Sequence, residues 1–257
     1  MLLFAACKQD APADQKQTIT EFQKAMDRLK SDPGKPAAQN FIAELSKELT
    51  TTEDDTKKMD LLLKGLKVAE EYKMGQVAIG FLMPLVKDFP KNPQHEEQFA
   101  KLASALNDIG KGIPGSILVE AYETTFPSGK YLDKLKTKQQ EDIPDLEAYI
   151  QKLAEAVFEN PDKYGINRAA AQKYVDTCEA FAIGFPNREK SPQYLYGAAE
   201  MARTLKTYQK ALSIFDWIEE KYPDYEKTPT TVFLKGFMLE NELSNKEAAR
   251  KVYSRFL

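Results

Sequence analysis

Two stretches of the chain, FPNREKSP at residues 185–192 and YPDYEKTP at residues 222–229, are versions of one eight-residue pattern. The second begins 37 residues after the first. An aromatic residue followed by proline also occurs at residues 89–90 and 126–127, so the intervals between the four pairs are 37, 59 and 37 residues. A recurring interval of this length is typical of stacked helical repeats.

Each aromatic-proline pair predicts the end of a helix. Proline has no backbone N–H and its ring clashes with the preceding helical turn, so a helix stops before it. After the last two pairs, Ser191 and Thr228 are predicted to be N-caps, with Pro192 and Pro229 at the first helical position. The chain is therefore predicted to be all-α and built from helical hairpins.

The period and the residue pattern resemble the tetratricopeptide repeat, a 34-residue helix–turn–helix unit. In residues 192–225, Ala198, Ala199 and Ala211 are the small residues that close helix packing needs, and Pro223 stands at the proline position of the repeat. The tryptophan expected in the first helix is missing. The resemblance implies an α-solenoid of stacked hairpins with a right-handed superhelix. An irregular helical bundle is the alternative, but it leaves the 37-residue period unexplained.

The next aromatic-proline pair would fall near residue 259, so we expect the natural protein to continue beyond Leu257.

The residue pattern divides the chain into six segments. The predicted segments are a truncated lipoprotein signal (1–7), a flexible tether (8–17), an N-terminal helical hairpin (18–52), two tetratricopeptide-like repeats (56–129), a diverged hairpin with an insertion (130–190), and two tetratricopeptide repeats of which the last is truncated (191–257).

The composition argues against several classes of protein. The 257 residues include 36 Lys and Arg against 39 Asp and Glu. Nucleic-acid binding needs a clear basic excess, so no nucleic-acid partner is expected. The two cysteines, Cys7 and Cys178, are too few for a disulfide framework or a cysteine metal cluster. Cys178 lies in a helical pattern and is predicted to be a buried, inert thiol.

No motif predicts catalysis. His95 is the only histidine and is expected to face solvent in a turn. GKGIPG at residues 110–115 spells G-x-G-x-x-G, but a helical pattern precedes it where a dinucleotide site needs a strand. We therefore predict no catalytic residue, no cofactor and no metal site, and we predict that the chain is not an enzyme.

The N-terminal sequence LFAAC, residues 3–7, resembles the lipobox of bacterial lipoproteins. Ala5 and Ala6 are the small residues before cleavage, and Cys7 is the residue that would be lipidated. Two features depart from the pattern: Phe4 stands where leucine is most usual, and only six residues precede Cys7. Residues 8–17 contain no large apolar side chain and are predicted to be a tether.

Together these features resemble the outer-membrane tetratricopeptide lipoproteins of Gram-negative bacteria, in particular the Bacteroidetes type. The accessory lipoprotein of the β-barrel assembly machinery and the periplasmic coordinator of the Tol–Pal system have this architecture. The resemblance implies an outer-membrane lipoprotein that faces the periplasm and is held by its lipid anchor. A cytoplasmic location is the alternative if Cys7 is not lipidated.

The same resemblance implies a non-catalytic scaffold that binds protein or peptide partners through the first helix of each hairpin, here called helix A. Aromatic residues and arginine dominate binding hot spots. The alternative for the aromatics is packing between repeats. Alternatives for the whole chain are a glycan-capturing lipoprotein of a nutrient-uptake system and an all-helical enzyme. The candidate partner-binding residues are Tyr196, Glu200, Arg203, Phe233, Phe237 and Glu240.

Overall fold

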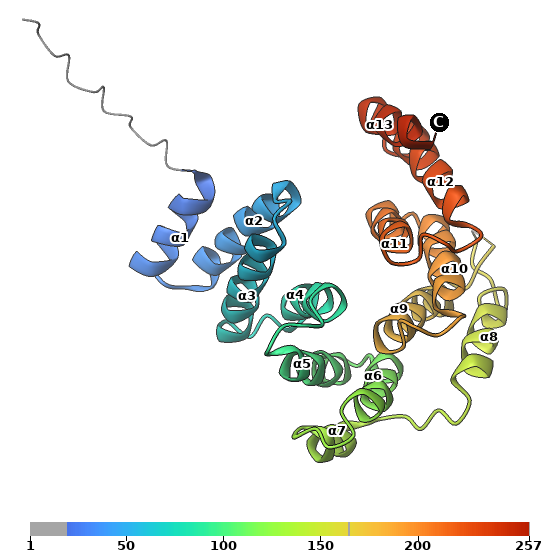
Figure 1. Ribbon diagram of the computed structural model, residues 1–257, viewed down its shortest axis with the longest axis horizontal. Helices are drawn as coiled ribbons and strands as arrows, with labels where there is room; N and C mark the ends of the chain where they lie inside the picture. Colours follow the sequence, from blue (N-terminus) through green and yellow to red (C-terminus); the bar gives the residue numbers. More distant parts are fainter. Residues whose placement is uncertain (1–19, 164, 257) are drawn as a thin grey trace, which may run out of the picture. The chain divides into compact units, whose positions relative to one another are not determined.

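The structure is a computed structural model that describes residues 20–163 and 165–256, and within these residues it is all-α (Figure 1). Cys7 and the predicted tether lie outside the described residues. No strand occurs in the described part of the chain. The helices are α1 (Glu21–Ser31), α2 (Lys35–Thr51), α3 (Asp55–Glu71), α4 (Gly75–Asp88), α5 (His95–Asp108), α6 (Gly112–Thr125), α7 (Leu132–Lys138), α8 (Leu146–Ala156), α9 (Arg168–Gly184), α10 (Ser191–Thr204), α11 (Tyr208–Lys221), α12 (Thr228–Asn241) and α13 (Lys246–Phe256).

The chain divides into two compact units, Met1–Tyr72 and Lys73–Leu257. In the first unit α1 packs on α2, and α2 packs on α3. The rings of Phe22 and Phe41 lie 5.6 Å apart between α1 and α2. Thr20 accepts a hydrogen bond from the backbone N–H of Gln23, which caps the start of α1. The division between the units falls between α3 and α4, inside the predicted segment 56–129.

In the second unit, successive helices pack as antiparallel neighbours. The pairs α4 with α5, α5 with α6, α10 with α11, and α12 with α13 are in contact. The long interval of 59 residues is taken up by α7 and by α8 with the turn that follows it. As a result α9 packs directly on α6 as well as on α8 and α10. Gly184 of α9 allows this approach, since a Cβ there would lie 2.6 Å from the methyl carbon of Ala121 on α6.

The four aromatic-proline pairs end helices as predicted. Helices α4, α6, α9 and α11 each stop at the residue before the aromatic. The four aromatics share one backbone conformation, with φ between −132° and −121° and ψ between 53° and 67°. The recurring sequence pair is therefore also a recurring backbone structure, and it closes α4, α6, α9 and α11, here called the B helices. These aromatics are Phe89, Phe126, Phe185 and Tyr222.

The prediction that Ser191 and Thr228 are N-caps is wrong. Lys190 and Lys227 occupy the cap positions, and the two hydroxyl residues are the first residues of α10 and α12. The Ser191 hydroxyl donates a hydrogen bond of 2.6 Å to the carbonyl oxygen of Phe185. Thr228 makes the matching bond of 2.8 Å to the carbonyl of Tyr222. The reason is that the turn after each aromatic folds back tightly, which places the hydroxyl over the end of the preceding helix.

Candidate functional site

Two features of the second unit could form a site: a cleft lined by tyrosines on the helix A side and a groove at the ends of the B helices. Within the described residues, no group of three or more His, Cys, Asp or Glu side chains is placed to hold a metal ion. Of the helices that the structure describes, none is both long and apolar enough to cross a membrane. Cys178 is fully buried, as predicted, and burial raises the pKa of its thiol.

The first feature, which we call the tyrosine cleft, lies between α8 and α10. Both helices pack on α9, and the space between them is a cleft of about 640 Å³. Tyrosines come from three elements: α9, α10 and the turn between α11 and α12. The residues that matter for its chemistry are Tyr174, Lys190, Tyr194, Tyr196, Tyr225 and Lys227.

Tyr174 forms part of the wall of the cleft and is itself held by packing. It is 8% exposed and lies close to the Cys178 thiol on the same helix. Burial raises its pKa. Gly197 of α10 makes room for the phenol, because a Cβ there would overlap the Tyr174 hydroxyl oxygen. One rim of the cleft is joined by an ion pair of 2.6 Å between Lys190 Nζ and Glu147 Oε2.

The other tyrosines of the cleft have hydroxyl groups with no hydrogen-bond partner among the described residues. Tyr194 packs edge-on against Phe181 at 5.0 Å between ring centroids, and Tyr196 lies 6.3 Å from the ring of Phe215. Partial burial raises the pKa values of Tyr194, Tyr196 and Tyr225. Within the described part of the chain these three hydroxyls make no hydrogen bond to protein. They are therefore available to a ligand.

The six residues predicted from the sequence lie on two A helices, α10 and α12. Tyr196 lines the tyrosine cleft. Glu200 and Arg203 lie further along α10 and form an ion pair of 3.5 Å. Phe233 and Phe237 of α12 are 49% and 38% exposed, and Glu240 is exposed on the same helix. All six predicted residues therefore lie on A helices. Of the six, only Tyr196 lines the tyrosine cleft.

The two groups of predicted residues are equivalent by the repeat. Tyr196 and Phe233 are 37 residues apart, and each packs against an aromatic of the following B helix at 6.3 Å between ring centroids. The partners are Phe215 and Tyr253. In the α10 repeat, Lys227 Nζ also lies 4.8 Å from the centre of the Tyr196 ring. Both rings therefore take part in packing between helices, and their role in binding a partner stays a prediction.

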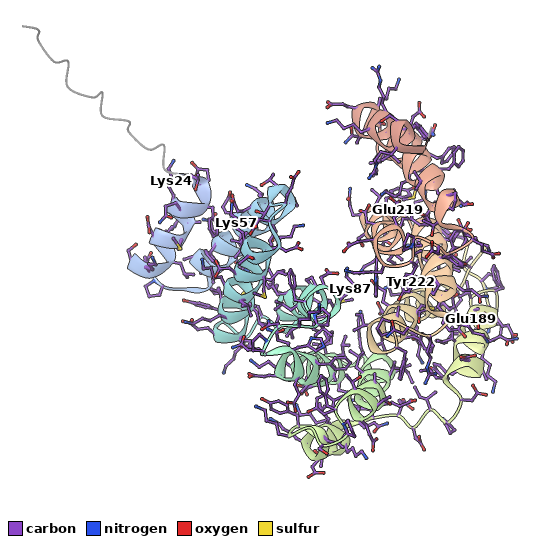
Figure 2. All side chains as sticks on the ribbon, viewed as in Figure 1. Lys24, Lys57, Lys87, Glu189, Glu219 and Tyr222 are labelled. Atoms are coloured by element: carbon purple, nitrogen blue, oxygen red, sulfur yellow. The ribbon has the colours of Figure 1, made fainter. Side chains whose placement is uncertain are left out.

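The second feature, which we call the α4–α11 groove, was not predicted. It has a volume of about 990 Å³ and lies where the C-terminal ends of α4, α9 and α11 come together. Figure 2 labels Lys87 and Tyr222, which line it from the ends of α4 and α11. Lys87 Nζ lies 5.1 Å from the centre of the Trp217 ring. The signal that could have found this groove is the set of aromatic-proline pairs, because they mark the helix ends that meet there.

His95 also lines the α4–α11 groove, so the prediction of a solvent-facing turn residue is wrong. It is the first residue of α5 and is half-buried, with its ring 6.0 Å from both Phe99 and Phe126. Burial lowers its pKa. Among the described residues, no protein group makes a hydrogen bond to its buried Nδ1 atom. Phe126, which follows the last residue of α6, packs against the His95 ring and helps to bury it. The sequence around His95 does not reveal this contact.

No protein-family model matches the sequence, and no curated protein matches it.

Proposed function

We propose that the chain is a non-catalytic scaffold that binds protein or peptide partners through the A helices of a tetratricopeptide-like array. The observation that carries the proposal is the tyrosine cleft, an open site of 640 Å³ between two A helices. Its uncommitted phenol hydroxyls and aromatic ring faces are the groups that protein-binding surfaces use most.

Three features support the repeat assignment. The aromatic-proline pairs close helices at matching positions with matching backbone angles. The hydroxyl-to-carbonyl bonds of Ser191 and Thr228 recur at the same offset. The ring pair of Tyr196 and Phe215 is repeated by Phe233 and Tyr253. Together they favour a repeating array over an irregular bundle.

The same proposal includes a lipid anchor at Cys7 and a place at the bacterial outer membrane. Its support is the sequence LFAAC followed by a polar tether. Lipidation adds membrane affinity that depends on the number of acyl chains. Radiolabelled palmitate should enter the full-length gene product and should be lost in Cys7→Ala. Equal labelling of both forms would remove the anchor from the proposal.

The binding surface is tested by photo-crosslinking in cells that naturally contain the protein. A photoreactive phenylalanine analogue replaces Tyr196 in the cleft or, as the control, Tyr149, which lies on α8 outside the cleft with Lys173 Nζ 5.8 Å from its ring centre. We expect protein adducts from position 196 that are absent from position 149. Arg203→Glu should weaken capture of the same partner without unfolding the chain. Adducts of equal yield at both positions, or unchanged capture by Arg203→Glu, would contradict the proposed surface.

A further inference from the structure

The α12–α13 hairpin, residues 228–256, has a lysine in the interface through which it packs on α11. Lys235 is only 4% exposed, and its ammonium group forms ion pairs with Asp216 and Glu219 of α11. The distance from Lys235 Nζ to Glu219 Oε1 is 2.8 Å. One repeat earlier, 37 residues before Lys235, the fully buried Ala198 holds this position. The hairpin therefore makes an ionic contact where the previous repeat has an apolar side chain.

The other residues that α12 buries add little apolar contact. Of its four buried residues, Met238 has the only apolar side chain. The buried hydroxyl of Thr231 donates to the carbonyl oxygen of Thr228 in its own helix, so it adds no bond across the interface. A segment that buries few apolar groups opens locally at a lower free energy. By contrast, α10 buries five apolar side chains, those of Pro192, Leu195, Ala198, Ala199 and Ala202.

The contacts inside the hairpin are of the opposite kind. Met238 of α12 and Val252 of α13 are both buried. The rings of Phe233 and Tyr253 lie 6.3 Å apart. Gly236 lets the two helices approach closely, because a Cβ there would overlap the Tyr253 ring. Apolar packing therefore holds the hairpin together, whereas charged groups attach it to α11.

Two further contacts join the hairpin to the preceding repeat, and each involves a charged group. Glu242, which follows α12, accepts a hydrogen bond of 2.8 Å from the Tyr208 hydroxyl of α11. Lys227, which precedes α12, lies over the Tyr196 ring of α10. Both charged side chains are exposed, so these contacts add little to the attachment. The Lys235 ion pairs are the buried part of it.

We propose that the α12–α13 hairpin undocks from α11 as one unit, and that the Lys235 ion pairs are the clamp that keeps it docked. Docking holds the exposed rings of Phe233 and Phe237 next to the repeat that carries Tyr196. Undocking separates these two groups of predicted partner-binding residues. A partner that contacts both groups would then favour the docked state. This role in binding rests on the proposed function, whereas the undocking itself does not.

An ionic clamp differs from ordinary packing in its response to salt. Lys235 has lost most of its contact with water, but the Asp216 side chain is still 64% exposed. Dissolved ions therefore reach the carboxylate and screen its attraction for the lysine. An apolar side chain of similar length at position 235 would hold the hairpin without this dependence, and such replacements of buried ion pairs are often neutral or stabilising.

The experiment is hydrogen exchange measured by mass spectrometry on the whole 257-residue chain under native conditions. The slowest amides of α12 and α13 should have equal protection, within about threefold, because they open together. They should exchange at least about tenfold faster than the slowest amides of α9 and α10. An increase in NaCl from about 0.05 to 1 M should speed exchange in α12 by about threefold or more relative to α10.

Two variants of Lys235 separate charge from packing. Lys235→Ala removes both the ammonium group and the side-chain stem, so exchange in α12 and α13 should become about tenfold faster or more. Lys235→Met keeps a long apolar side chain, so exchange at low salt should be no faster than in the unaltered chain, and the dependence on salt should disappear. Lys251→Ala is the control, because that side chain is 75% exposed on α13. Circular dichroism shows that each variant is folded.

Three results would overturn the inference: different protection in α12 and α13, protection in the hairpin equal to that in α9 and α10, or the same salt dependence in Lys235→Met as in the unaltered chain. Hydrogen exchange of the chain alone involves no partner, so each of these results would leave the scaffold proposal standing. Conversely, a lack of protein adducts at position 196 would remove the scaffold and leave the undocking hairpin.

Discussion

Lys221 Nζ lies 3.6 Å from Asp88 Oδ1, so an ion pair joins the last residue of α11 to the last residue of α4. Asp88 also pairs with its neighbour Lys87 at 2.6 Å, and Lys221 also pairs with Glu220 at 2.8 Å. The two helices are far apart in the sequence, and both end at aromatic-proline pairs. Charged side chains therefore link two helix ends across the α4–α11 groove.

This ion pair should contribute little to stability. The side chains of Lys221 and Asp88 are 35% and 26% exposed, so solvent screens their attraction. In a double-mutant cycle with Lys221→Ala and Asp88→Ala, we expect a coupling free energy of about 1 kcal/mol or less, falling further in 1 M salt. Urea unfolding measures it. A coupling above about 2 kcal/mol that persists in high salt would contradict this prediction.

The hydroxyl that follows each of the last two aromatic-proline pairs should contribute more. Ser191 is fully buried and its hydroxyl bonds the Phe185 carbonyl at 2.6 Å. Ser191→Ala should lower the free energy of unfolding by about 1 kcal/mol, the usual net value of such a bond. Thr228→Val should behave in the same direction. Ser213→Ala is the control, because that hydroxyl is exposed and bonds only the carbonyl one turn before it. Equal stability losses in Ser191→Ala and Ser213→Ala would argue against the role of the recurring bond.

Gly184 should be required for the close approach of α9 to α6. The added methyl group of Gly184→Ala would lie 2.6 Å from the Ala121 methyl carbon, so we expect destabilisation of about 1–3 kcal/mol. Gly80→Ala is a matched control in the interior of α4, where an added Cβ meets nothing within 4 Å. That variant should gain about 0.5–1 kcal/mol from helix propensity. Denaturant unfolding of both variants should therefore give shifts of opposite sign.

His95 should titrate below its ordinary pKa of 6.5, because burial disfavours the charged ring. The unfolded chain then binds more protons than the native state, so the contribution of His95 to stability is lost as the pH falls below 6.5. Since the chain has one histidine, a single NMR titration curve reports its pKa directly. Phe99→Ala should move the pKa back toward 6.5 by opening the site to water. A measured pKa at or above 6.5 in the unaltered chain would contradict the buried position.

Glu179 should give the opposite dependence on pH. Burial raises the pKa of its carboxyl above 4.5, although Lys210 lies 3.0 Å away and acts in the other direction. The native state then holds the proton more tightly than the unfolded chain. The contribution of Glu179 to stability is therefore greatest below pH 4.5 and is lost as the pH rises through the raised pKa.

Glu179→Gln tests this sign. The amide is neutral at every pH, so the decline in stability above pH 4.5 that Glu179 causes should disappear. Urea midpoints at intervals from pH 4.5 to 7.5 in both proteins measure the difference. His95→Gln, analysed in parallel, removes the opposing slope of the histidine. A Glu179→Gln variant with the same pH profile as the unaltered chain would show that burial does not control this carboxyl.

The helices were predictable because their stop signals are local. Phe185 and Tyr222 end helices through the proline that follows them, and that effect needs only the neighbouring backbone. The caps were not predictable in the same way. Ser191 fits the N-cap preference in sequence, but its hydroxyl reaches a nearer acceptor once the turn has folded.

The candidate site was predictable only in part, and for a similar reason. The repeat register predicted Tyr196 as a partner-binding residue on a helix A. In the structure Tyr196 lies on α10 and lines the tyrosine cleft, and partner binding there stays a prediction. It did not reveal Tyr174 or Tyr225, which come from a helix B and a turn. These residues meet because α8 and α10 both pack on α9 and leave a cleft between them.

The sequence by itself determined the all-α class and the ends of the B helices, because aromatic-proline pairs act on the backbone beside them. It also pointed to Cys7 and its tether as a lipid anchor, which stays a prediction because those residues lie outside the described structure. Only the tertiary structure decided which side chains share a site. The half-buried ring of His95, the uncommitted tyrosine hydroxyls and the ion pair of Lys221 with Asp88 depend on contacts between distant helices, and no local pattern encodes such contacts.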